Sequence, residues 1–257
     1  MKIAISGKWG VGKTTVCVHM AKYLSDQGRK VLLVDADPDA NLASALGLTP
    51  DQEPEPVSEL KELIHERTGA SSTGGAVFRL NPDVSDIPEK YSTRLDNIHL
   101  LRLGNLSRGG AGCFCPEGAF LKALVNHLFL YQDEVVIIDM EAGIEHLGRA
   151  SAQGVDVMLV VVEPGTRALM TAATVKRCAA DIGVHRIAVV LNKYRSEEER
   201  DWLTRQLEGY CIAGSLPFDT EIAESDRKGR CAYSGSGPQR ERMAELFSAL
   251  TTLVSGE

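Results

Sequence analysis

The sequence predicts an α/β fold in which a mainly parallel central sheet is flanked by helices, and two observations support this prediction. Short apolar runs alternate with longer helical runs along most of the 257 residues, and this alternation is typical of a parallel sheet built from strand–helix–strand units. A glycine-rich turn joins the first apolar run directly to the first helical run. Since one α/β domain can reach this length, we expect a single domain over residues 1–257.

The expected strands are short apolar runs bounded by polar or turn-forming residues. In chain order they lie at residues 2–6, 30–34, 98–103, 134–139, 155–162 and 186–192. The helical runs between them lie at residues 14–24, 117–130, 167–182 and 197–207. A last run, residues 240–253, has an amphipathic pattern without a basic final turn, so we expect it to pack on the fold rather than anchor in a membrane.

Residues 49–95 interrupt the alternation of strands and helices. They hold Pro50, Pro54 and Pro56, a run rich in glycine and serine, and one short helical candidate at residues 59–67. We interpret this stretch as an irregular insertion on the sheet of the single domain.

The turn after the first strand carries the strongest functional signal. Residues 7–15 read Gly-Lys-Trp-Gly-Val-Gly-Lys-Thr-Thr and match the phosphate-loop pattern G-x-x-x-x-G-K-[ST] in full. The glycines let successive N–H groups point at phosphate oxygens, Lys13 adds a positive charge, and Thr14 offers a hydroxyl to Mg²⁺. The sequence therefore predicts a P-loop NTPase. Its expected nucleotide contacts in this loop are Gly10, Val11, Gly12, Lys13, Thr14 and Thr15.

Two predicted strands end in carboxylates at the edge of the sheet where the phosphate loop also lies. Asp35, Asp37 and Asp39 follow the second strand, and Asp139 ends the strand at 134–139. An apolar strand that ends in a carboxylate is how a Walker B acid approaches Mg²⁺, so we expect Asp139 to bind magnesium with Thr14. The alternative for the first group is a solvated acidic turn.

The residues after a later strand indicate which base is bound. Asn192 and Lys193 begin an Asn-Lys-x-Asp pattern, but Arg195 stands where a guanine site needs a carboxylate. We therefore prefer adenine. Asn192 and Lys193 are expected nucleotide contacts, and the segment around Pro217 resembles the loop that packs beside the base.

The phosphate loop resembles the deviant form Lys-Gly-Gly-Val-Gly-Lys-Thr-Thr of the ParA/MinD superfamily, which also includes the nitrogenase iron protein. This resemblance implies a homodimer that closes on ATP and hydrolyses it to ADP and phosphate. It implies that Lys8 reaches the partner's nucleotide and stabilises negative charge on the phosphates, as an arginine finger does elsewhere. It further implies that Asp37 orients the attacking water and that Asp35 helps to hold the magnesium shell. The expected catalytic residues are Lys8, Asp37 and Lys13.

One departure and one further match accompany this resemblance. Trp9 stands where the superfamily pattern has glycine, and such a ring must point outward or into the dimer partner. Residues 140–145 resemble the second switch, in which a glycine senses the γ-phosphate. We assign no role to Glu141 within it, because a loop carboxylate near phosphates is repelled unless it is paired.

A pair of cysteines one residue apart lies in a glycine-rich loop at residues 109–116. Cys113 and Cys115 can both face one ion if the backbone turns there, and a symmetric dimer brings four thiolates together. Four thiolates are enough for a tetrahedral or square-planar metal site. The alternative is two incidental loop cysteines.

With this cysteine pair, the chain as a whole resembles the CooC/AcsF group of nickel-handling ATPases. The matching pieces are the phosphate loop and residues 35–39, 113–115, 139–147 and 163–164. The resemblance implies that nickel binds through Cys113 and Cys115 at the subunit interface. It further implies delivery to an apo nickel enzyme, carbon monoxide dehydrogenase or acetyl-CoA synthase. Thiolates also accept Zn²⁺, so zinc can occupy the same site.

Two alternatives stay open at this point. Four cysteines at a dimer interface can hold an iron–sulfur cluster, so the chain could be an ATP-gated electron donor resembling the nitrogenase iron protein. It could also be a metal-free positioning switch of the ParA/MinD type.

Composition limits the partners and the compartment. The net charge of −7 argues against a nucleic-acid partner, which needs a basic stripe. No apolar run approaches the roughly 20 residues that cross a bilayer, so we expect no membrane partner. Six cysteines without a secretory signal suit a reducing compartment, and we expect a cytoplasmic protein.

Overall fold

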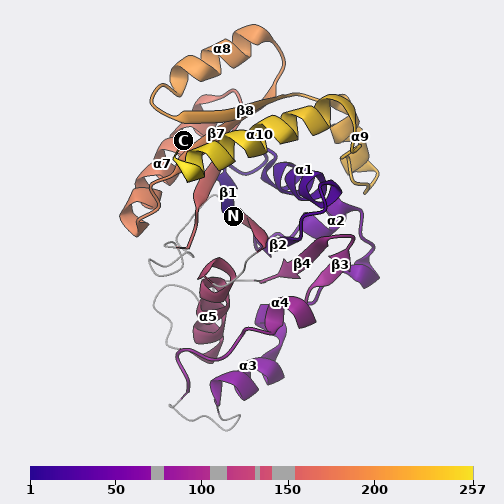
Figure 1. The fold of residues 1–257 in the computed structure, drawn as a ribbon, viewed down its shortest axis with the longest axis vertical. Coiled ribbons are helices and arrows are strands. Elements are labelled where there is room, and N and C mark those ends of the chain that lie inside the picture. Colours follow the sequence, from indigo (N-terminus) through magenta and orange to yellow (C-terminus); the bar gives the residue numbers. More distant parts are fainter. Residues whose placement is uncertain (71–77, 105–114, 131–133, 141–153, 257) are drawn as a thin grey trace.

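The central sheet has eight strands in the order β3-β4-β2-β5-β1-β6-β7-β8 (Figure 1). The structure is a computed structural model and describes residues 1–70, 78–104, 115–130, 134–140 and 154–256. For residues 129 and 130 it describes the backbone alone. All neighbouring strands are parallel except β3 and β4, which are antiparallel. The strands are β1 Lys2–Gly7, β2 Val31–Ala36, β3 Thr93–Leu95, β4 Ile98–Arg102, β5 Val135–Met140, β6 Val157–Val162, β7 Ile187–Tyr194 and β8 Cys211–Pro217.

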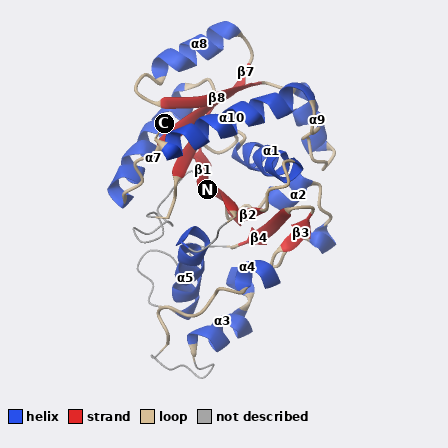
Figure 2. Cartoon of the chain, viewed as in Figure 1, coloured by secondary structure: helices blue, strands red, loops and turns tan. Residues whose placement is uncertain are grey.

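Helices connect these strands and cover the sheet (Figure 2). They are α1 Lys13–Asp26, α2 Leu42–Leu46, α3 Lys61–Thr68, α4 Ile87–Lys90, α5 Pro116–Leu130, α7 Thr166–Ile182, α8 Glu197–Gln206, α9 Thr220–Arg227 and α10 Gly237–Ser255. The β1–α1–β2 and β6–α7–β7 crossovers run in opposite directions along the sheet. Because such crossovers are right-handed, α1 and α7 lie on opposite faces. The predicted α/β fold, with a mainly parallel sheet flanked by helices, is therefore confirmed.

The direction of the chain changes at β1, and this decides where a ligand can bind. From β1 the chain moves to β2 on one side, whereas β6, β7 and β8 follow on the other side. In an open α/β sheet, the crevice at the carboxyl ends of the strands around such a reversal is the usual ligand site. The phosphate loop begins there, at the end of β1.

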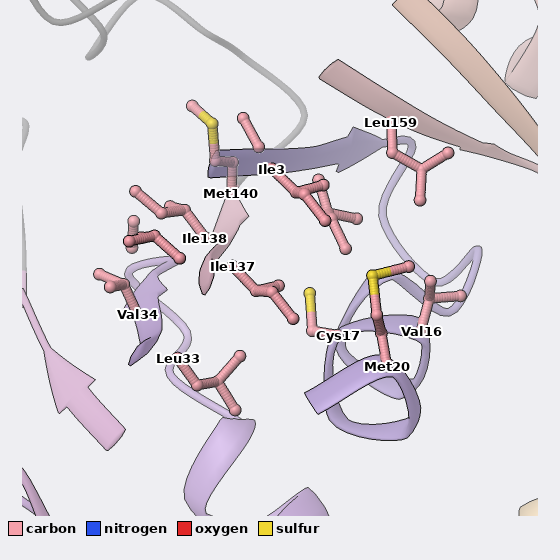
Figure 3. Close-up of a cluster of buried hydrophobic side chains, with 14 of the residues drawn as sticks. Ile3, Val16, Cys17, Met20, Leu33, Val34, Ile137, Ile138, Met140 and Leu159 are labelled. Atoms are coloured by element: carbon pink, nitrogen blue, oxygen red, sulfur yellow. The ribbon is translucent and has the colours of Figure 1, made fainter. Parts of the chain in front are cut away.

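Part of the core lies between the sheet and α1 (Figure 3). Ile3 from β1, Leu33 from β2 and Ile137 from β5 are fully buried, and Cys17 and Met20 of α1 are buried beside them. A buried stripe on α1 of this kind anchors the whole helix, because each fully buried large side chain contributes roughly 1.5–3 kcal/mol of transfer free energy. The sheet and α1 therefore hold the phosphate loop at both of its ends.

The two edge strands, β3 and β8, are the strands that the sequence pattern does not reveal. β8 contains Gly214 and ends at Pro217, which are turn-forming residues in a sequence reading. An edge strand tolerates both, because one side of its backbone has no ladder partner. Residues 49–95 hold β3, α3, α4 and two short 3₁₀ turns, and α3 contacts α5. None of the helices described is both long enough and apolar enough to cross a membrane.

Candidate nucleotide-binding site

The phosphate loop runs from the end of β1 into the first turn of α1. Gly10 and Gly12 have φ angles of 81° and 96°, in the left-handed region that favours glycine. A Cβ atom added to Gly12 would lie 2.6 Å from Asn192 Nδ2, so a side chain at this position would displace Asn192. No side chain caps α1 in the described part of the chain, which leaves its first N–H groups available to an anion. The loop is therefore a cradle for phosphate.

The two lysines of the loop have different environments. Lys13, at the start of α1, is buried. Lys8 lies at the tip of the loop with its side chain 36% exposed, and its Nζ is 3.1 Å from Glu163 Oε1, just after β6. The neighbouring Trp9 is 77% exposed. Lys13 is thus enclosed within the chain, whereas Trp9 is exposed and Lys8 is partly exposed.

The predicted magnesium ligands come together beneath the loop. Thr14 Oγ1 donates a hydrogen bond of 2.6 Å to Asp139 Oδ2. Asp35 and Asp139 are paired in register at the ends of β2 and β5. Asp139 Oδ1 is buried and has no hydrogen-bond partner among the described residues. A buried carboxylate oxygen without a partner is costly, and a magnesium ion or one of its waters would satisfy it.

The raised pKa values of Asp139 and Asp35 are also consistent with a bound cation. Burial raises the pKa of Asp139 to about 7, and the charge of Asp35 adds to this while the Thr14 hydrogen bond opposes it. Burial likewise raises the pKa of Asp35 to about 6, although the backbone N–H groups of Leu42 and Asp37 lower it. Two buried acids that resist ionisation side by side favour a bound divalent cation. No group of three or more potential metal-binding side chains occurs among the described residues.

These raised pKa values predict a pH-dependent stability. With folded-state pKa values of about 7 and about 6, Asp139 and Asp35 keep protons that the unfolded chain has already released. Their contribution to stability is therefore present below about pH 4 and is lost as the pH rises through 6 to 7. Relative to an Asp139→Asn variant, the wild-type protein without Mg²⁺ should lose about 2–4 kcal/mol of unfolding free energy between pH 4.5 and 8. Urea unfolding of both proteins across this range measures the difference.

The matched control is Asp181→Asn, which removes an exposed carboxylate from α7 and should follow the wild-type profile. Saturating Mg-ADP should flatten the wild-type profile, because the cation compensates the ionised carboxylates. Parallel profiles for wild type and Asp139→Asn would show that burial does not shift this group.

Asp37 lies on the rim beyond the end of β2. Its Oδ1 accepts the N–H of Asp39 at 3.0 Å, which shapes the turn through Pro38. Asp37 is only partly buried, so its carboxylate remains accessible at the edge of the phosphate cradle. Asp39 is exposed, and its N–H helps to position Asp37.

The expected base contacts gather at the ends of β7 and β8. Asn192 Nδ2 donates a hydrogen bond of 2.7 Å to Val11 O, and Lys193 Nζ donates one of 2.6 Å to Gly10 O. These bonds hold the phosphate loop to β7. An amide has two N–H donors and one carbonyl oxygen, so Asn192 keeps a donor and the acceptor for a base. Thr15, Asn192 and Pro217 line one pocket.

Some predicted residues lie outside the described part of the chain, namely Cys113 and residues 141–145 of the second switch, which include Glu141. Cys115 is described. It directly precedes α5, is partly buried, and its Sγ accepts the N–H of Gly118 at 3.3 Å.

Sequence reasoning missed two polar residues at this site. Glu163 was noted only as part of a matching motif, and its ion pair with Lys8 joins residues 155 positions apart. His19 also lines the base pocket, although it carries no ligand spacing in the sequence. Its position four residues after Thr15, on the same face of α1, was the available signal.

The nucleotide-binding domain model of the CobQ/CobB/MinD/ParA family matches residues 2–232. The chain belongs to this family. It is 42% identical over 256 residues to the carbon monoxide dehydrogenase accessory protein CooC of Rhodospirillum rubrum, covering 99% of this chain and 97% of that protein. It is also 42% identical over 257 residues to an uncharacterized ATP-binding protein of Methanocaldococcus jannaschii, covering 98% of both chains.

Solved structures agree on the fold. The MinD cell division protein of Aquifex aeolicus superposes with a TM-score of 0.68 at 19% identity, covering 100% of this chain and 97% of that one. MinD of Pyrococcus horikoshii, solved with Mg-ADP, gives a TM-score of 0.65 at 22% identity, covering 95% and 93%. The expected resemblance to the CooC group and to the ParA/MinD superfamily is confirmed. The protein is an ATP-binding ATPase, and its family implies ATP, ADP and Mg²⁺ as ligands.

Proposed function

We propose that this protein is a dimeric Mg²⁺-dependent ATPase that binds nickel through Cys113 and Cys115 at its subunit interface. It delivers the metal to a nickel enzyme such as carbon monoxide dehydrogenase or acetyl-CoA synthase. The observation that carries the proposal is the 42% identity to a carbon monoxide dehydrogenase accessory protein over 99% of this chain. In this proposal residues 1–257 form one ATPase domain with an insertion at 49–95.

The environment of Cys115 supports a role as a metal ligand. Its sulfur lies at the N-terminal end of α5, a helix of 15 residues, and accepts a backbone N–H there. The positive end of a helix dipole and a donated hydrogen bond both favour the thiolate, which is the form that binds metal. The cysteine is partly rather than fully buried, so an ion can reach it. A cysteine that only filled the core would be placed like Cys17, which is fully buried.

The arrangement around the phosphate loop gives each residue a role in hydrolysis. The N–H groups of the loop and Lys13 hold the phosphates, and Thr14 and Asp139 would hold Mg²⁺, which would neutralise phosphate charge. Asp37, on the accessible rim, orients the attacking water. Lys8 of the partner subunit stabilises the charge that develops on the transferred phosphoryl group.

The ATPase cycle and the metal site are coupled through the dimer. ATP favours the closed dimer, which gathers four thiolates, and hydrolysis loosens it. Nickel affinity should therefore be highest with a non-hydrolysable ATP analogue and lower with ADP or without nucleotide. Equal affinity in all three states would exclude the coupling, because a ligand without differential affinity shifts no equilibrium.

Anaerobic nickel titration of the metal-free protein, with the mass determined in parallel, tests the proposal. We expect one nickel per dimer with a thiolate charge-transfer band, and Mg-ATP-dependent activation of apo carbon monoxide dehydrogenase by the loaded protein. A brown protein absorbing near about 400 nm would instead indicate an iron–sulfur electron donor. Absence of metal binding would leave a nucleotide-dependent switch.

A further inference from the structure

The pocket beside the expected base contacts continues along α1. Its walls come from α1, the ends of β7 and β8, α9 and α10. Asn192 and Pro217 lie at the ends of β7 and β8, where the base is expected, and Thr15 directly follows Thr14, an expected magnesium ligand. His19 lies one helical turn beyond Thr15 on the same face of α1. The pocket therefore leads from the phosphate loop, past the base contacts, to His19.

His19 is a buried polar residue with no structural hydrogen bond at one of its nitrogens. It is 5% exposed, and its Nε2 has no hydrogen-bond partner among the described residues. The ring packs against Tyr233, with ring centroids 5.6 Å apart. Each buried polar atom without a partner in a native structure needs an explanation, and a bound ligand is one such explanation. A histidine needed only for packing could be replaced by an apolar ring without leaving a nitrogen unsatisfied.

The nearby carboxylate of Asp219 does not form a hydrogen bond with this nitrogen either. Burial lowers the pKa of His19 to about 4, and the nearby Asp219 opposes this shift without cancelling it. The carboxylate of Asp219 is engaged elsewhere, because Oδ1 accepts the N–H of Glu221 at 2.8 Å and Oδ2 accepts from Gln239 Nε2 at 3.3 Å. His19 is therefore a neutral imidazole near pH 7, with one nitrogen that donates and one that accepts.

We propose that His19 reads the bound base, with its unpartnered Nε2 accepting a hydrogen bond from the exocyclic amine of adenine. This role rests on the proposed function as an ATPase. It also rests on the expected contacts of Asn192 and Pro217 with the base. Adenine presents an N–H₂ donor on the edge where guanine presents a carbonyl oxygen. An accepting Nε2 favours the amine and opposes the carbonyl, because two acceptors would face each other. His19 thereby adds to the discrimination that Arg195 provides by denying guanine a carboxylate.

The test compares two diphosphates that differ only in this amine. ADP and purine riboside 5′-diphosphate, which lacks the 6-amino group, are titrated by calorimetry with Mg²⁺ into the full chain, so that neither hydrolysis nor ATP-driven dimerisation intervenes. The wild type should bind ADP about 5- to 10-fold more tightly than the analogue, the size of one neutral hydrogen bond. In His19→Phe this ratio should fall to about 1- to 2-fold, while His19→Gln, which keeps an acceptor, should retain part of it.

The controls separate this proposal from the others. His185→Phe changes an exposed histidine outside the pocket and should keep the wild-type ratio. The same ratio in wild type and His19→Phe would overturn the role of His19, whether or not the protein binds nickel. A chain that bound neither diphosphate would overturn the nucleotide site itself.

A second measurement covers the case in which His19→Phe does not fold. In the wild-type protein labelled with ¹⁵N-histidine, ADP should shift the Nε2 resonance of His19, and purine riboside 5′-diphosphate should leave it near its unliganded position. Identical spectra with the two nucleotides would contradict the proposal, because the contact would then not involve the amine.

Discussion

Replacing Lys8 by alanine should lower steady-state ATP hydrolysis by about 100-fold or more, while the affinity for ADP changes by less than about threefold. The reason lies in the different placement of the two loop lysines. Lys13 is buried at the start of α1, whereas Lys8 is 36% exposed and pairs with Glu163, just after β6. A side chain so placed contributes little to holding a nucleotide in its own subunit. Hydrolysis by Lys8→Ala, together with ADP titration, separates the two effects.

Mixing two inactive variants tests whether Lys8 acts on the partner's nucleotide. Each site of the proposed dimer consists of Asp37 from one subunit and Lys8 from the other. A heterodimer of Lys8→Ala with Asp37→Ala therefore has one intact site and one site with both lesions. With random exchange, half of the dimers are heterodimers, so an equimolar mixture should recover about a quarter of the wild-type rate. If Lys8 acted within its own subunit, each site would keep a lesion and the mixture would stay inactive.

A matched control removes a lysine with a similar carboxylate partner elsewhere. Lys30 is exposed and directly precedes β2, at the end of that strand opposite Asp35. Its Nζ lies 3.9 Å from Glu134 Oε1. Lys30→Ala should leave hydrolysis within about twofold of wild type, because exposed ion pairs contribute little. A loss of rate in Lys30→Ala comparable to that in Lys8→Ala would assign the effect to general destabilisation.

The grouping of the expected magnesium ligands could be predicted from the sequence, because their proximity is a property of parallel sheets. Asp35 and Asp139 end β2 and β5, and parallel register places such ends at one edge whatever the loops do. The phosphate loop is fixed to the same edge by β1, which pairs with β5. A periodic apolar pattern and a terminal carboxylate were therefore sufficient to bring Thr14 and Asp139 together.

The contacts between Lys8 and Glu163 and around His19 could not be predicted in this way. Each depends on the direction of a side chain relative to an element distant in sequence, which no local pattern encodes. His19 reads as one more buried position of α1 until β8, α9 and α10 form a pocket around it. The hydrogen bond from Asn192 to Val11 likewise requires the end of β7 to approach the phosphate loop closely.

Replacing both cysteines of the pair by alanine should lower nickel affinity by at least about 100-fold, and each single replacement should come close to this. In a symmetric dimer, a single replacement removes two of the four thiolates, which leaves too few for a closed site. ATP hydrolysis should persist in Cys113→Ala/Cys115→Ala, because the residues assigned to phosphate and magnesium lie on other elements. Anaerobic titration with detection of the charge-transfer band measures the metal, and phosphate release measures the ATPase.

Cys211→Ala is the matched control, because Cys211 is an exposed cysteine on the edge strand β8. It should bind nickel like the wild type, which shows that surface thiols alone do not account for the signal. Retained nickel binding in the double variant, together with its loss in Cys211→Ala, would move the site away from the 113–115 loop. Loss confined to the variants of the pair, with hydrolysis intact, would separate the metal cargo from the ATPase that carries it. The metal site and the nucleotide site share no residue. We therefore expect that, in this case, the two sites are coupled only through the closing of the dimer.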